Sequence, residues 1–310
     1  MRSPLPLPPR SGSLRLPVAS DKLGALDFLA LSGCEVQITI GKRNSSLGRM
    51  ARDSQRLLLE LEYLRLAPDC VQTMRTAGRD ALATQLQRSW QEKQQQLAAR
   101  IFNATLGSAE YRSFWRTPHA GGKYPAVNES YSADALRGIN HRVRNWLQGD
   151  YRADNWQFEI HLSEVAGGPG GVLLEALARQ ADWLRQADAM LQTRLERGPL
   201  CGPSTRHRAA DVLPNVVRRY FVEGIQPKAA LLERRRYELL APLQELEGIL
   251  DAVLPTQYRQ WMEQRNALLA EAATAPRTHV ASVQRILAPC SAPGQPVISA
   301  SNTGLPEADG

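Results

Sequence analysis

The chain has 310 residues and a net charge of +7, with 43% hydrophobic and 22% charged residues. This balance is typical of soluble globular proteins and excludes the disordered and membrane-spanning classes, since no apolar run approaches the roughly 18 residues needed to cross a bilayer. The positive charges are mostly arginines scattered among acids, which favours solvated helix faces over a nucleic-acid groove.

The first 19 residues hold five prolines, which disfavour helix, so we expect an extended proline-rich arm. The segment 20–290 is predicted to form a single helical domain, with a loose division into lobes 20–116 and 131–290 as the alternative. The tail over 291–310 has the composition of a disordered segment.

Helical spacing of apolar residues predicts a helix that begins near Asp21 and ends at Gly33. The next stretch alternates like a strand between Cys34 and Ile40, but a short helix is favoured because no partner strand lies nearby. Leucine stripes then predict one helix over 52–66, ended by proline, and a second over 69–104.

Ser108 is expected to cap a short helix holding several aromatic residues, and residues 117–130 are predicted to form a loop. Further helices are expected over 132–147, 154–165, 174–195, 205–223, 227–250, 255–272 and 276–287. The glycine-rich segment Gly167–Gly171 is interpreted as a flexible turn rather than an anion site. We therefore predict an all-α, multi-helix bundle-like array with long amphipathic helices.

The four cysteines, Cys34, Cys70, Cys201 and Cys290, are widely spaced, with no C-x-x-C pair and no histidine at ligand spacing. We therefore expect no metal and no cofactor. An even number of dispersed cysteines fits two disulfides in an oxidising compartment, with four buried thiols in a cytosolic protein as the alternative. Of three connectivities, Cys34–Cys70 with Cys201–Cys290 is favoured because each pair brackets a helical region.

Motifs of serine hydrolases, P-loop proteins and zinc proteases are absent from the sequence. Asp154, Glu159 and Glu164 near Trp156 could supply a pair of glycosidase carboxylates, but acids on a helix face are common. The sequence thus assigns no catalytic residue.

Arg43, Asn44, Ser45 and Ser46 form the polar cluster that we single out as a candidate ligand-binding site. They lie at a break between two predicted helices. A helix cap is the simpler interpretation, because serine and asparagine side chains accept hydrogen bonds from the first backbone N–H groups of a helix.

The ordered set of Cys34, Arg43-Asn44-Ser45-Ser46-Leu47-Gly48, Ser54-Gln55-Arg56-Leu57, Cys70 and Cys201-Gly202-Pro203 resembles a gammaproteobacterial lipoprotein family of unknown function, domain-of-unknown-function family 3080. The likeness covers residues 20–293. Members typically begin with a lipoprotein signal and a lipidated cysteine, so the resemblance implies a periplasmic body anchored to the outer or inner membrane. The start at Met1 lacks that segment, which leaves a cytoplasmic protein as the alternative if Met1 is the true start. The family implies no activity or catalytic residue.

We therefore expect a non-enzymatic binding or scaffold module of the bacterial cell envelope. Its partner would be an envelope protein or an anionic envelope polymer, and no nucleic acid is expected. One alternative is a cell-wall-active hydrolase that uses carboxylates in a cleft. A second is a cytosolic nucleic-acid-binding helical protein.

Overall fold

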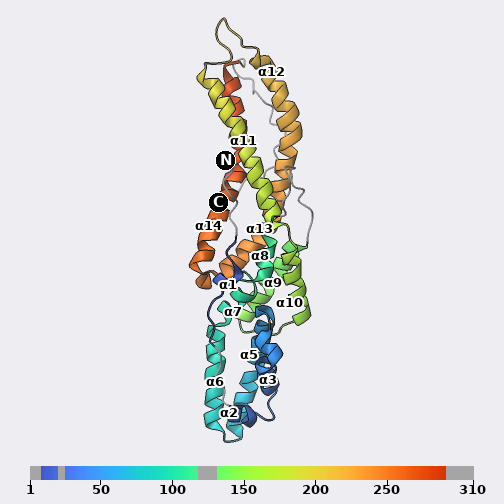
Figure 1. Cartoon of the computed structure of the whole chain (residues 1–310), viewed down its shortest axis with the longest axis vertical. Helices are drawn as coiled ribbons and strands as arrows, with labels where there is room; N and C mark the ends of the chain where they lie inside the picture. Colours follow the sequence, from blue (N-terminus) through green and yellow to red (C-terminus); the bar gives the residue numbers. More distant parts are fainter. Residues whose placement is uncertain (1–7, 20–24, 118–130, 291–310) are drawn as a thin grey trace.

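The computed structural model describes residues 8–19, 25–117 and 131–290. Within these ranges the regular elements are helices, which confirms the predicted all-α array, and one isolated bridge joins Cys201 to Arg206. The helices are stacked along one long axis, so the molecule is an elongated rod (Figure 1). Its buried apolar side chains form three core clusters.

One end of the rod, at the bottom of Figure 1, is built from the N-terminal helices. These are α2 (Ala25–Ala30), α3 (Val36–Asn44), α4 (Ser46–Met50), α5 (Asp53–Thr76) and α6 (Asp80–Gln95). Helix α3 is the predicted short helix: Val36 and Ile40 are buried one turn apart, whereas Ile38 is exposed. The disulfide Cys34–Cys70 ties the start of α3 to α5, which confirms the first favoured pairing.

The middle of the rod contains shorter helices. These are α1 (Ser11–Leu14), α7 (Leu97–Ala104), α8 (Ala109–Phe114), α9 (Ser132–Leu147) and α10 (Asn155–Ala166). Ser108 caps α8 as predicted, because its Oγ accepts a hydrogen bond from the Tyr111 N–H. Helix α8 thereby directs Phe114 into the core, where the side chain is fully buried.

The turn Gly167–Gly171 wraps closely around the end of α8. A Cβ on Gly170 would lie 2.2 Å from the Phe114 ring, and one on Gly171 would lie 2.4 Å from the Trp115 carbonyl oxygen. These glycines are required by close packing, because any larger residue would collide with α8. Tight packing, and not chain flexibility, explains the glycines at positions 168, 170 and 171.

The other end of the rod, at the top of Figure 1, is built from long helices. These are α11 (Gly170–Glu196), α12 (Ala209–Val216), the π-helix η1 (Val217–Ile225), α13 (Gln226–Ile249) and α14 (Thr256–Leu287), with the 3-10 turns η2 (Asp251–Val253) and η3 (Ala288–Cys290). Helices α11 and α14 pack side by side and run in the same direction, whereas α12, η1 and α13 form one continuous run in the opposite direction. The disulfide Cys201–Cys290 joins the segment after α11 to η3, directly after α14, which confirms the second favoured pairing.

Two predicted helix breaks at prolines are wrong. Helix α5 continues through Pro68, and α14 continues through Pro276. An interior proline removes a backbone hydrogen bond and costs about 3 kcal/mol. In α5 the buried stripe continues past Pro68, from Leu64 to Val71. Burying each large side chain contributes about 1.5–3 kcal/mol, which offsets that cost.

The actual breaks fall at other residues. The single helix expected over 69–104 is wrong, because α5 ends at Thr76 and the rest is divided into α6 and α7. Gly78 makes the first break, with a φ of +70° that favours glycine. The two helices expected over 205–223 and 227–250 are one run, in which the π-helix takes the place of a break.

Residues 8–19 are fixed against the middle of the rod. They include one helical turn, α1, within the segment expected to be extended. Leu14 is buried in the central core, and the Asn103 side chain exchanges hydrogen bonds of 2.8 and 3.0 Å with the backbone of Leu16. The side-chain amide therefore anchors this segment to α7.

The start of the predicted arm, nearly all of the predicted 117–130 loop and the predicted 291–310 tail lie outside the described residues. Among the helices that are described, none combines the length and apolar character required to cross a bilayer.

Candidate functional site

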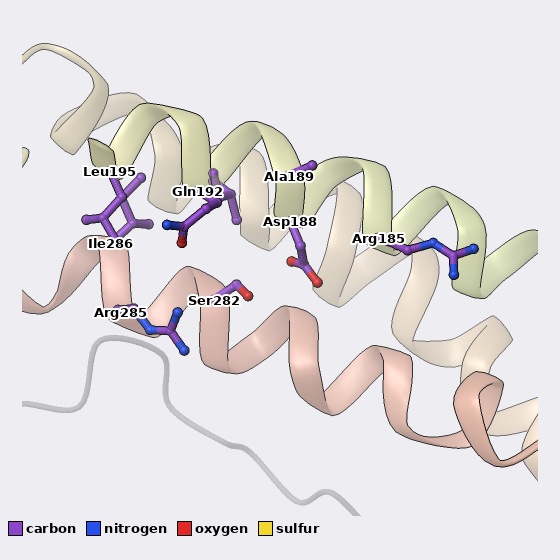
Figure 2. A pocket seen from close by; sticks show the side chains of 9 residues that line it. Arg185, Asp188, Ala189, Gln192, Leu195, Ser282, Arg285 and Ile286 are labelled. Carbon is purple, nitrogen blue, oxygen red and sulfur yellow. The ribbon is translucent and has the colours of Figure 1, made fainter. Parts of the chain in front are cut away.

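A groove of about 330 Å³ lies between α11 and α14 (Figure 2). It forms because the apolar stripe of α11 extends beyond the part that neighbouring helices cover fully. Leu184 is buried, but Leu191 and Leu195, which continue the stripe toward the end of the helix, are only half-buried. The exposed flank of this stripe becomes one wall of the groove.

The groove is lined by both helices. The lining residues are Arg185, Asp188, Ala189, Leu191, Gln192 and Leu195 from α11, and Ser282, Arg285 and Ile286 from α14. Leu195 and Ile286 meet at one end and make it apolar, whereas polar side chains are spread along the rest of the groove (Figure 2). A ligand with one apolar group beside polar ones matches this lining.

The two arginines of the groove differ in their surroundings. Arg185 forms ion pairs with Asp182 of its own helix and with Glu271 of α14, so its charge is balanced across the interface. Arg285 is exposed and forms no ion pair with the described residues. In Figure 2 its guanidinium lies near the apolar end, where it could receive a carboxylate.

Asp188, which lines the groove, belongs to a largely buried pair with His279. Nδ1 of His279 lies 2.7 Å from Oδ1 of Asp188, and the imidazole packs on the Phe221 ring at 4.9 Å between centroids. Phe221 belongs to the π-helix, so this contact links all three helical runs of this end. The pair links α11 to α14.

Although the groove region contains serine, histidine and aspartate, their contacts do not form a catalytic triad. The Ser282 hydroxyl donates to the Thr278 carbonyl at 3.1 Å. A nucleophilic serine requires a hydrogen bond to the histidine. Asp188 is the one carboxylate among the nine lining residues, whereas a glycosidase site uses two.

The predicted cluster Arg43, Asn44, Ser45 and Ser46 lies at the junction of α3 and α4, away from the groove. Ser45 is the N-cap of α4, as the simpler interpretation held: its Oγ accepts from the Gly48 N–H at 3.0 Å. That hydroxyl also donates to a backbone carbonyl of α3. Ligand binding by these four residues stays a prediction.

Arg43 takes part in a mostly buried ion cluster. Its Nη1 lies 3.3 Å from Oε1 of Glu60, and the same carboxylate contacts Lys93 and Arg100. Glu60 and Lys93 are almost fully buried, so these charges stabilise one another in a low-dielectric setting. This cluster joins α3, α5, α6 and α7.

The other acids weighed in the sequence do not gather in a cleft. Asp154 is the N-cap of α10 and accepts from the Gln157 N–H. Glu159 and Glu164 follow on that helix, and none of the three lines the groove. Within the described ranges, no three His, Cys, Asp or Glu side chains converge as metal ligands.

The groove was not predicted from the sequence, because its two walls come from segments about 90 residues apart. The leucine stripe of α11 was visible in the sequence. The register of α11 against α14 leaves Leu191 and Leu195 partly uncovered, and it is determined by tertiary packing.

The model of one protein family, described as "Protein of unknown function (DUF3080)", matches residues 1–293. Neither the curated proteins nor the solved structures contain a match to the chain.

Proposed function

Because this chain belongs to the DUF3080 family, which brings no known activity with it, we propose a function from the groove. The protein is a disulfide-clamped helical binding module of the cell envelope. It holds a segment of a partner protein between α11 and α14. The segment presents an apolar side chain next to a carboxylate.

The observation that carries this proposal is the pairing of an apolar end with an exposed arginine in one groove. The half-buried Leu195, packed beside the buried Ile286, offers a site for an apolar anchor, and Arg285 lies at the same end of the groove. A volume of about 330 Å³ is at the lower end for a ligand pocket, which fits a short anchor better than a large ligand. Apolar anchors set in a polar surround typically dominate the energy of such interfaces.

The two disulfides support a compartment outside the cytosol, because disulfides persist mainly where thiols are not kept reduced. Together with the lipoprotein resemblance, this favours the periplasm, with an N-terminal lipid anchoring the full-length protein. The Cys201–Cys290 bond clamps the end of the rod that holds the groove.

The alternatives have less support. A hydrolase would need a nucleophile hydrogen-bonded to a base, or a second carboxylate facing Asp188 across the groove. An anionic polymer would be repelled by three acids in or beside the groove, which offset the attraction of its arginines. These acids are Asp182, Asp188 and Glu271. Nucleic-acid binding has no support from α13, whose arginines pair with Glu233 and Glu238.

Site-specific photo-crosslinking tests the proposal. A benzophenone amino acid replaces Gln192, which lines the groove, in cells that express the full-length protein. The matched control replaces Met190, which is 71% exposed and does not line the groove. We expect a discrete protein adduct from position 192 and none from position 190. Equal adducts from both positions, or none from either, would contradict the proposal.

A further inference from the structure

Helix α4 displays the two most exposed large hydrophobic side chains in the described part of the chain. Leu47 is 85% exposed and Met50 is 86% exposed. Residues three positions apart on a helix lie on one face, so the two side chains project together. We call the segment Lys42–Arg52, which contains them, the elbow.

The elbow is held rigidly, so this exposure is built into the fold. Ser45 caps α4, and a Cβ on Gly48 would lie 2.2 Å from the Lys42 carbonyl oxygen, which shows how closely α4 packs on the end of α3. Nη2 of Arg56 donates to the Arg49 carbonyl at 2.5 Å and fixes the other side. The backbone therefore cannot turn the apolar pair inward without breaking these contacts.

The charged side chains of the elbow are all positive. Residues 36–52 contain four cationic side chains and no Asp or Glu. Lys42 and Arg52 each reach one carboxylate of a neighbouring helix, at 3.5 and 3.6 Å, while remaining more than half exposed. Exposed ion pairs of this kind contribute little to stability, so these cations can exchange their carboxylate partners for other anions. Arg49 is exposed and forms no ion pair with described residues.

We propose that the elbow docks on an anionic lipid surface. Leu47 and Met50 enter the boundary between headgroups and acyl chains, while Lys42, Arg49 and Arg52 contact lipid phosphates. Apolar side chains with a cationic surround are the combination that binds such surfaces. The cationic surround favours a lipid surface over a partner protein, because it matches the phosphates of anionic headgroups. This inference goes beyond the proposed function, because the elbow and the groove lie in different halves of the rod.

Vesicle flotation of the purified 310-residue chain tests the inference. The vesicles contain either phosphatidylglycerol with phosphatidylethanolamine, or phosphatidylcholine alone. We expect binding to the anionic vesicles, about tenfold or more weaker in the double variant Leu47→Asp/Met50→Asp. The matched control Trp156→Asp/Met190→Asp changes two other exposed hydrophobic residues and should bind like the wild type. Arg49→Glu/Arg52→Glu should lose the preference for anionic vesicles.

Thermal unfolding of each variant checks that the fold is retained, as expected for exposed positions. The inference is overturned if the wild type binds neither kind of vesicle, or if Leu47→Asp/Met50→Asp binds as well as the wild type. Equal loss in the control double variant also overturns it. If the elbow variant loses a protein partner while vesicle binding is unchanged, the surface belongs to that protein and not to lipid.

Discussion

Arg265 donates two parallel hydrogen bonds to Glu247, of 2.7 and 2.9 Å, in the centre of the rod. Both side chains are almost fully buried, and the guanidinium also lies over the rings of Trp115 and Trp261. The Tyr258 hydroxyl donates to the same carboxylate at 2.7 Å. This pair joins α13 to α14, so we expect it to contribute to the stability of the fold.

Replacement of Glu247 by Gln should therefore be strongly destabilising. The change leaves the buried Arg265 charge without a counter-charge, which costs about 3–5 kcal/mol of unfolding free energy. Glu238→Gln on the same helix is the matched control, because its arginine pairs are partly exposed and should contribute less than about 1 kcal/mol. Chemical denaturation measures both, and equal effects would contradict this account of the core.

Two tyrosines of the same cluster should make the protein less stable at alkaline pH. Burial, and next the charge of Glu247, raises the pKa of Tyr111 above its ordinary value. Burial also raises the pKa of Tyr258, with Tyr111 and Glu247 as further causes. Both groups keep their protons when folded but lose them when unfolded above about pH 10, so unfolding is favoured as pH rises beyond that value.

Ultraviolet absorbance of tyrosinate measures this effect. In the native protein the Tyr111 and Tyr258 signals should lag behind those of exposed tyrosines and appear together with unfolding. The double variant Tyr111→Phe/Tyr258→Phe should lose the part of the lagging component that these two residues supply. Ordinary titration of both residues in the folded protein would rule out the proposed burial effect.

The glycines at the start of α11 should tolerate substitution poorly. Gly171→Ala places a methyl group 2.4 Å from the Trp115 carbonyl oxygen, and we expect it to lower the unfolding free energy by about 1–3 kcal/mol. Gly248→Ala is the control, since nothing lies within 4 Å of its added methyl group. Alanine there should stabilise α13 by roughly 0.5–1 kcal/mol. Denaturation midpoints that shift in the same direction for both variants would contradict the packing argument.

Local signals in the sequence predicted much of the fold. The Ser108 cap followed from capping chemistry, and the helix after Cys34 from the absence of a partner strand. Both disulfide pairings, across 36 and 89 residues, were favoured because each pair brackets a helical region. Helix ends at Pro68 and Pro276 were mispredicted, because the burial of continuing apolar stripes outweighs the local cost of proline.

The candidate site was predictable only in part. A helix cap was predicted for the cluster from Arg43 to Ser46, and Ser45 is the residue that caps α4. The exposure of Leu47 and Met50, however, depends on how α4 packs on α3. The groove depends on the register of α11 against α14, which neither helix encodes alone. Such register is set by the whole interface, including the buried pair Asp188–His279.

The most direct test of the central claim is the affinity of the partner captured at position 192. Isothermal titration would compare the wild type with Gln192→Trp, which fills the groove, and with Met190→Trp, which adds the same bulk outside it. We predict about tenfold weaker binding for Gln192→Trp and wild-type affinity for Met190→Trp. Wild-type affinity for Gln192→Trp would contradict the claim that the partner occupies the groove between α11 and α14.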